Sequence, residues 1–244
     1  MSLGEPGKKG SEGKVGMNSI ESTGALGLNV VNFPRVALSP LVDRFRYRIV
    51  KRSLDASLAA VGLMLLSPGF LLLAALTKLT SSGPVFYPWD VIGRGGGPFR
   101  GYKFRTMVVG ADELKPQLVH KNEMTGPVFK MSADPRITPL GRFLRKYSLD
   151  ELPQLWSVLK GDMSLVGPRP AGPLEWEKYE PWQRRKLSVT PGMTCLWQVN
   201  GRNRVSDFDE WVRMDLNYID RWSLWLDLRI LLCTVAVVLR GTGM

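Results

Sequence analysis

The sequence predicts a mainly helical α+β membrane protein with a re-entrant membrane helix and a small β-hairpin. Three observations predict this fold class. The most apolar segment of the 244-residue chain, residues 54–76, contains a Ser-Pro pair. Downstream, a glycine-rich turn separates two strand-like segments. Most of the remaining chain consists of short segments whose apolar residues recur with helical spacing.

As a straight helix, Leu54–Leu76 is long enough to cross a hydrocarbon core of about 30 Å. Ser67 and Pro68 are near its middle, where proline removes a backbone donor and clashes with the preceding turn. Lysine or arginine flanks both ends, and such residues favour the cytoplasmic side. We therefore expect a re-entrant helix over residues 51–80. A kinked helix that spans the membrane and a buried core helix are the alternatives.

The residues before this segment divide into two parts. Residues 1–28 are polar and lack the apolar run of a secretory signal, so we expect a flexible tail. Residues 29–50 are basic and form the predicted juxtamembrane segment, in which Leu41, Phe45 and Ile49 recur with helical spacing. A helix lying against anionic lipid headgroups is favoured over a solvated basic helix, because an apolar segment follows.

The predicted hairpin has strands at residues 83–87 and 99–107 around a turn at residues 93–98. The turn does not match the dinucleotide-binding fingerprint, because Pro98 stands where its third glycine belongs. Helices are predicted for residues 108–120, 140–146, 153–160, 173–188, 208–222 and 224–239. The last of these is interrupted by charged residues and is too short to cross a membrane, so we expect it at the membrane surface or in the core.

The composition narrows the partners and the chemistry. The 33 lysine and arginine residues exceed the 22 aspartate and glutamate residues, which gives a net charge of +11. This charge suits nucleic acid, anionic lipid or a phosphorylated substrate. No nucleic-acid-binding motif is present, so we expect no nucleic-acid partner. Cys195 and Cys233 do not suggest a disulfide framework, and the single His120 excludes a multi-histidine zinc site.

Two adjacent carboxylates, Asp150 and Glu151, are the first candidates for chemistry. Ser148 and Glu151 have the spacing of a capping box, but a helix beginning there would place Pro153 inside it, at the cost of a hydrogen bond. A helix that begins at Pro153 instead puts both carboxylates just before a positively polarised end, which also favours phosphate. Adjacency alone does not say which carboxylate would act as a nucleophile.

Basic residues near rigid backbone are the candidates for phosphate binding. Arg169 lies between Pro168 and Pro170, and a guanidinium held in this way suits bidentate phosphate contact. Taken alone, the Pro-Arg-Pro sequence is better interpreted as an extended loop. Lys103 and Arg105 fall on one face of the second predicted strand.

In this order, the motifs resemble the bacterial sugar transferases, which are monotopic polyprenyl-phosphate phosphoglycosyl transferases. The resemblance extends over residues 51–244, about four fifths of the chain. It rests on residues 51–55, 67–68, 83–86, 102–107, 134–138, 148–155, 161–170, 191–194, 197–202 and 225–228. Residues 24–50 and 122–130 are similar to the long form of the family, whose N-terminal transmembrane helices we expect to be absent from this chain.

The resemblance implies a role for each candidate residue. Asp150 would be the nucleophile, and Glu151 would help to hold Mg²⁺. Ser67 and Pro68 would break the membrane helix, and residues 81–244 would form the catalytic domain. The implied phosphate- and substrate-binding residues are Lys103, Arg105, Arg145, Pro168, Arg169, Pro170 and Arg202.

The implied reaction transfers a hexose-1-phosphate, glucose or galactose, from a UDP-sugar to polyprenyl (undecaprenyl) phosphate. It would release UMP, pass through an aspartyl phosphosugar and begin exopolysaccharide, capsule or O-antigen synthesis at the cytoplasmic face of the bacterial inner membrane. Donor, acceptor and membrane lipid are the expected partners, with a homodimer also considered. A membrane scaffold with an inactive site is the alternative function.

Two positions depart from the family pattern. Trp89, Asp90 and Val91 occupy a stretch where the family usually carries a glutamine and an arginine. Cys195 replaces a usual glycine, which predicts a local shift or a negative φ at that residue.

Overall fold

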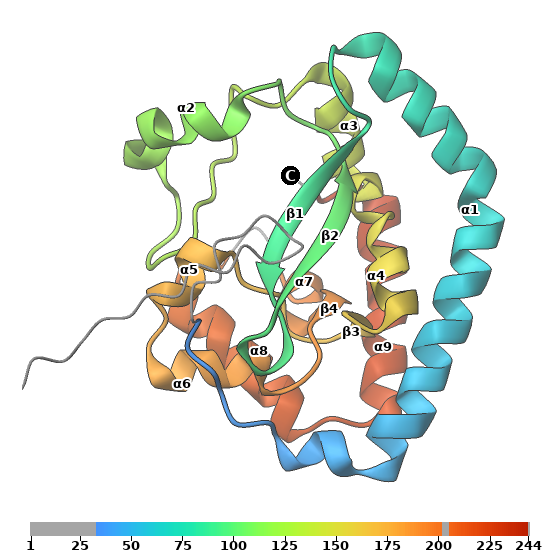
Figure 1. Ribbon diagram of the computed structural model, residues 1–244, viewed down its shortest axis with the longest axis vertical. Helices are drawn as coiled ribbons and strands as arrows, with labels where there is room; N and C mark the ends of the chain where they lie inside the picture. Colours follow the sequence, from blue (N-terminus) through green and yellow to red (C-terminus); the bar gives the residue numbers. More distant parts are fainter. Residues whose placement is uncertain (1–32, 202–204, 244) are drawn as a thin grey trace, which may run out of the picture. The chain divides into compact units, whose positions relative to one another are not determined.

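A computed structural model describes residues 33–201 and 205–243. The predicted tail and the candidate Arg202 lie outside these described residues. The described part is mainly helical with small β-structure, as predicted (Figure 1). Its helices and strands are α1 (Arg52–Thr80), β1 (Phe86–Ile92), β2 (Pro98–Phe104), α2 (Ala111–Leu118), α3 (Pro139–Lys146), α4 (Gln154–Lys160), β3 (Ser164–Val166), α5 (Pro173–Glu177), α6 (Pro181–Arg184), β4 (Gly192–Thr194), α7 (Leu196–Val199), α8 (Phe208–Asp220) and α9 (Leu224–Arg240).

Helix α1 continues from a π-helical turn, Arg46–Lys51, and leaves most of its apolar side chains exposed. Leu65 is 69% exposed, Leu71 74% and Leu79 82%. Within the described residues, Arg46–Thr80 is the one helix long and apolar enough to cross a membrane. A contiguous apolar surface of this kind marks a membrane or protein contact, so it favours membrane association.

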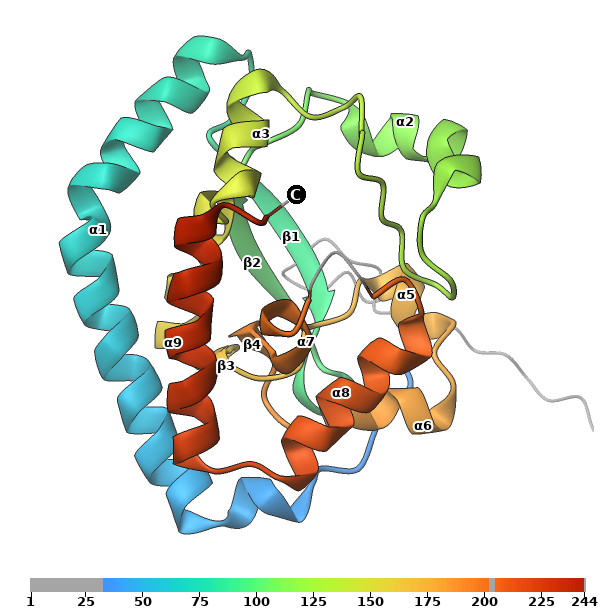
Figure 2. The ribbon, with the colours of Figure 1, turned by 180° about the vertical axis from the view of Figure 1, so that it is seen from behind.

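The Ser-Pro pair bends α1 and does not divide it. The helix is continuous from Arg52 to Thr80 with Pro68 inside it. Both views of the ribbon show α1 bowed around the neighbouring elements (Figures 1 and 2). Ser67 contributes a hydrogen bond from its hydroxyl to the Met64 carbonyl, at 2.8 Å. Proline inside a helix is a known cause of such bending.

Both ends of α1 are hydrogen-bonded to the elements that α1 bows around. At the first end, the Arg52 guanidinium donates to the carbonyl oxygens of Val158 and Leu159, at 2.5 and 2.6 Å. These carbonyls belong to the last turn of α4, where a cation is favourable. At the other end, the Arg105 guanidinium donates to the carbonyls of Ser81 and Ser82.

A buried polar cluster, here called the anchor cluster, joins the start of α1 to α9. Lys51 Nζ is 2.7 Å from Asp227 Oδ2 and 3.7 Å from Asp55 Oδ2. The Ser164 hydroxyl donates to Asp55 at 2.7 Å, and the Tyr218 hydroxyl lies 2.8 Å from the second oxygen of Asp227. Two motifs at opposite ends of the chain, residues 51–55 and 225–228, therefore meet in one cluster.

The hairpin is confirmed, although its first strand begins three residues later than predicted. β1 and β2 pair antiparallel, with Asp90 opposite Arg100. The Arg100 guanidinium donates two hydrogen bonds to the Asp90 carboxylate, at 2.5 and 2.8 Å. Gly95 and Gly96 in the turn have φ values of 68° and 81°, which favour glycine.

Several sequence predictions are wrong in detail. Residues 173–188 form α5, α6 and a 3-10 turn, because Pro181 begins a new helix where it cannot continue the old one. In the basic segment, Leu41 is buried while Phe45 is 68% exposed, so the two do not share an apolar face. Strands β3 and β4, which pair in parallel, and helix α7 were not predicted; each has only three or four residues.

Candidate active site

Six of the candidate residues line one cleft of about 600 Å³. Its walls come from β1, β2, the segment after β2, the start of α2, α3, the turn before α4 and the segment with Arg169. Beside apolar residues such as Pro84, the lining contains four carboxylates and four cations. Two of the carboxylates, Asp112 and Glu113, belong to α2 and were not candidates. The six charged candidates are Lys103, Arg105, Arg145, Asp150, Glu151 and Arg169.

Asp150 and Glu151 lie on a single 3-10 turn, Leu149–Glu151, with Pro153 directly before α4. Ser148 before this turn has a φ of 53°, the only positive φ of a non-glycine residue in the described chain. Its side chain caps no helix, so the capping-box alternative is wrong. Backbone in this region is strained, and such strain is common at functional sites.

Glu151 is held by cations. Its Oε1 accepts a hydrogen bond from Lys103 Nζ at 2.8 Å and lies 3.9 Å from the Arg169 guanidinium. Burial lowers the pKa of Lys103, while the Glu151 carboxylate opposes that shift. The Lys103 ammonium also lies 4.1 Å from the ring centre of Trp89. Lys103 is thus held in place from two sides.

Arg145 reaches the cleft because α3 packs very close to the segment after β2. A Cβ on Gly141 would lie 2.0 Å from the Thr106 carbonyl oxygen, so only glycine fits there. Arg145, one turn further along, donates from Nε to the Thr106 hydroxyl at 2.9 Å. Burial lowers the pKa of Arg145, and the nearby Asp150 carboxylate opposes this shift without reversing it.

Arg169 lies between two prolines that differ from it in their position relative to the cleft. Pro168 and Pro170 are buried and do not line the cleft, whereas Arg169 is half-buried and does. The Pro168 carbonyl accepts a hydrogen bond from the amide of Gly192 at 2.9 Å. The two prolines therefore flank the arginine without lining the cleft.

Arg105 differs from the other cations of the cleft. It lines the cleft, yet its guanidinium donates to the carbonyls at the end of α1. These bonds tie the end of α1 to the segment after β2, which is a different task from the predicted phosphate binding.

Mg²⁺ was predicted with Glu151 as a ligand, and the donor set can be tested for it. The described residues contain no group of three or more His, Cys, Asp or Glu side chains suited to a metal ion. Mg²⁺ commonly binds one or two carboxylates together with substrate phosphates. Asp150 and Glu151 fit this second arrangement, so the ion would be held jointly with a phosphorylated substrate.

Comparison with known proteins identifies the family of this chain. The model of the family described as bacterial sugar transferase matches residues 46–241. The chain belongs to this family. The resemblance predicted from the motifs is thereby confirmed.

Three relatives of this bacterial sugar transferase illustrate the match. The chain is 48% identical over 200 residues to the galactosyl transferase CpsE of Streptococcus agalactiae, which covers 82% of this chain and 44% of that protein. It is 45% identical over 201 residues to the undecaprenyl-phosphate galactose phosphotransferase of Salmonella typhimurium, covering 80% and 42%. It is 41% identical over 207 residues to the UDP-glucose:undecaprenyl-phosphate glucose-1-phosphate transferase of Xanthomonas campestris, covering 81% and 40%. The chain thus spans less than half the length of each.

Two aromatic residues of the cleft, Tyr87 and Trp89, were not predicted as site residues. Trp89 was noticed only as a departure from the family pattern, and the structure places the Lys103 ammonium over its ring. The other departure behaves as expected, since Cys195 has a φ of −150°.

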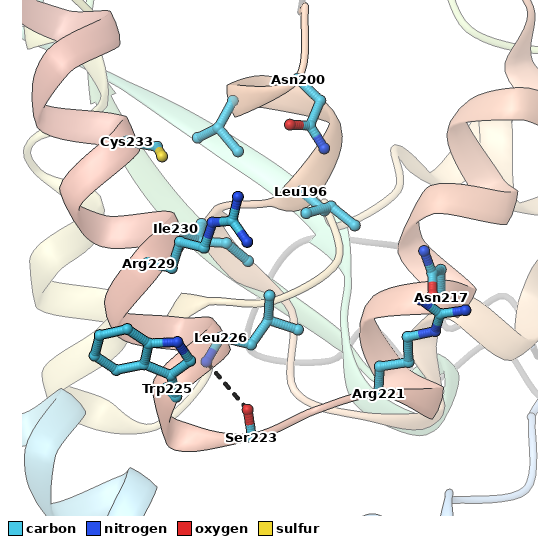
Figure 3. A pocket seen from close by; sticks show the side chains of 11 residues that line it. Leu196, Asn200, Asn217, Arg221, Ser223, Trp225, Leu226, Arg229, Ile230 and Cys233 are labelled. Carbon is cyan, nitrogen blue, oxygen red and sulfur yellow. Dashed lines mark hydrogen bonds between the residues drawn. The ribbon is translucent and has the colours of Figure 1, made fainter.

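A separate cavity of about 490 Å³ lies between α7, α8 and α9 (Figure 3). Arg221 and Arg229 line it together with Trp225 and other apolar residues, and no carboxylate lines it. Without a carboxylate it offers no nucleophile of the predicted kind, so the cleft with Asp150 remains the candidate active site.

Proposed function

We propose that this protein transfers a hexose-1-phosphate from a UDP-sugar to polyprenyl phosphate and releases UMP. One observation carries the proposal. A single cleft at the end of the membrane helix brings two carboxylates together with Lys103, Arg145 and Arg169. Membership of the sugar transferase family supports the same reaction, as do the names of the relatives.

The reaction would proceed in two displacements at one phosphorus atom. An oxygen of Asp150 attacks the sugar-bearing phosphorus, and the bond to the UMP oxygen breaks, so that UMP leaves with the electron pair. An oxygen of the lipid phosphate then attacks the same phosphorus and releases Asp150 as a carboxylate. Covalent catalysis divides one difficult displacement into two easier ones.

The surrounding cations lower the charge barrier to this attack. A diphosphate repels an approaching carboxylate, and Lys103, Arg145 and Arg169 offset that charge at the non-bridging oxygens. Glu151 would hold Mg²⁺ while Lys103 fixes the orientation of its carboxylate. The ion, when bound, supplies further neutralisation of the phosphates.

The membrane helix would be re-entrant, with the cleft on the cytoplasmic face of the inner membrane. As a straight helix, the 29 residues of α1 would extend about 44 Å, more than the hydrocarbon core. A spanning helix would separate its ends across the bilayer. Both ends of α1, however, are hydrogen-bonded to the same catalytic unit, through Arg52 and Arg105. This supports entry and exit on one side.

The transferred hexose would be glucose or galactose, and the lipid product would begin exopolysaccharide, capsule or O-antigen synthesis. The names of the three relatives include both sugars. The donor is identified by measuring UMP release from a panel of UDP-sugars. An inactive membrane scaffold would release none from any donor.

Intact-protein mass spectrometry tests the mechanism. Donor added without lipid acceptor should give a phosphosugar adduct on the peptide that contains Asp150. Asp150→Asn should abolish the adduct and UMP release, while Glu151→Gln should lower activity severely but respond to added Mg²⁺. An adduct retained by Asp150→Asn, or its absence under conditions of turnover, contradicts the proposed intermediate.

A further inference from the structure

Another cavity, of about 310 Å³, adjoins the catalytic cleft and is here called the second cavity. It is distinct from the cavity between α7, α8 and α9. Arg145 and Arg169 line both cavities. The Arg169 guanidinium lies 5.8 Å from the ring centre of Trp89, in the cleft, and 6.0 Å from that of Trp211, in the second cavity. The two cavities therefore meet at the cations beside the carboxylates.

The walls of the second cavity combine aromatic faces with fixed polar groups. Phe129, Trp197 and Trp211 supply the aromatic faces. Glu175 is held by the Gly172 amide, which donates to its Oε2 at 3.0 Å. A sugar ring presents an apolar C–H face together with several hydroxyl groups, and walls of this mixed kind bind both.

Trp197 gives an independent sign that a ligand belongs there. Its side chain is 6% exposed, and its indole Nε1–H has no hydrogen-bond partner in the described part of the chain. Buried donors without a partner are rare because leaving them unpaired is unfavourable. A ligand hydroxyl is an acceptor that would satisfy it. Trp197, a motif residue that neither proposed displacement uses, thereby acquires a role.

We propose that this second cavity, the sugar cavity, binds the hexose of the donor, while UMP and then the lipid phosphate occupy the cleft. The inference rests on the proposed function. In each in-line displacement, the entering group takes the side opposite the leaving group. In the second step Asp150 leaves, so the lipid phosphate enters where UMP departed. The hexose stays on the phosphorus throughout and therefore needs a place of its own.

The position of the membrane helix decides which cavity serves which group. The cleft contains Pro84 and Arg105, which adjoin the end of α1, and it has apolar walls at Val108 and Val109. The lipid acceptor would arrive from this side. The hexose accordingly takes the other cavity. Its volume is at the lower end of the range for small-molecule sites, about 300–1,000 Å³, and suits one ring better than a whole donor.

The loop that follows α2 would then set sugar preference. Met124, Val128, Phe129 and Met131 form part of the wall of the sugar cavity. Phe129 is half-buried, with the Lys115 ammonium 5.7 Å from its ring centre. Changes at this position reach the bound hexose without touching the carboxylates.

Trp197→Phe tests the assignment, because it removes the indole donor and keeps an aromatic ring. It should raise KM for the UDP-sugar about three- to tenfold, the effect of losing one hydrogen bond. The inhibition constant of UMP should stay unchanged, which also reports a folded cleft. Trp182→Phe, whose indole donates to Glu180 outside both cavities, is the matched control and should alter neither constant.

Phe129→Leu is the second variant, and it does not disturb the buried core. It should change the ratio of kcat/KM for UDP-glucose and UDP-galactose by about threefold or more, again without altering UMP inhibition. Weaker UMP inhibition in either variant would place the nucleoside in this cavity and overturn the inference, even with the wild type fully active. A wild type that releases no UMP from any UDP-hexose would instead overturn the proposed function itself.

Discussion

The anchor cluster and the catalytic cleft both pair lysine with carboxylates, but they balance charge in opposite ways. In the anchor cluster, one lysine faces two carboxylates, and hydroxyl and indole groups donate further hydrogen bonds to these carboxylates. Besides Tyr218, the Trp222 indole donates to Asp227 at 3.1 Å. Around the adjacent carboxylates Asp150 and Glu151, by contrast, the three cations Lys103, Arg145 and Arg169 are in the majority. Asp112 and Glu113 also line the cleft, but they belong to α2.

The difference shows what each region is for. A buried carboxylate that accepts several hydrogen bonds is satisfied within the protein and stabilises the fold. The surplus of positive charge around Asp150 and Glu151 is balanced when an anion binds beside them, which suits a diphosphate substrate. Changes to the anchor cluster should therefore act on stability, and changes to the cleft on activity.

The largest loss of stability is expected from Lys51→Met. It leaves Asp55 and Asp227 buried without their cation, and breaking a buried pair costs about 3–5 kcal/mol. The apparent Tm of the purified protein in detergent measures the effect. Lys78→Met, near the other end of α1, is the control. Equal Tm values for the two variants would contradict the distinction between the regions.

Lys103→Met should act on activity instead. Removing one charge-stabilising donor from an active site commonly costs about 10²–10³-fold in rate. UMP release should fall by this order, with an apparent Tm close to that of the wild type. Lys160→Met, at an exposed lysine outside the cleft, should retain full activity. A large fall in Tm with unchanged turnover would mean that Lys103 is structural.

Gly141→Ala tests whether close packing positions Arg145. The new methyl group would meet the Thr106 carbonyl, and overpacking of this kind costs about 1–3 kcal/mol. Because α3 must move away, KM for the donor should also rise. Gly69→Ala places the same methyl group in open space on α1 and serves as the control. Unchanged KM and Tm in Gly141→Ala would show that α3 adapts freely.

Asp90→Asn should have the smallest effect of the four. The ion pair of Asp90 with Arg100 is partly exposed on the hairpin, and pairs of this kind contribute little to stability. Its change in apparent Tm should be smaller than that of Gly141→Ala, and UMP release should be unaltered. A loss of activity would show that the hairpin surface takes part in donor binding.

The local elements were largely predictable because their signals lie within a few residues. The glycine turn at residues 93–98 marked the hairpin, and Pro153 marked the start of α4. Strands of three residues carry too little periodicity to be recognised, and therefore β3 and β4 were missed. Pro168 and Pro170 were predicted as substrate-binding residues, but they do not line the cleft, whereas Arg169 does.

The sequence by itself determined the apolar helix, the pair of carboxylates and the ordered motifs of the family. Only the tertiary structure decided which charges meet. Lys51 and Asp227 are 176 residues apart, and nothing in either local sequence specifies the other. The same holds for Arg145 and Thr106, and for the two cavities that share Arg145 and Arg169. Periodicity and turn chemistry act over a few residues, whereas a partner for a buried charge is chosen by the packing of the whole fold.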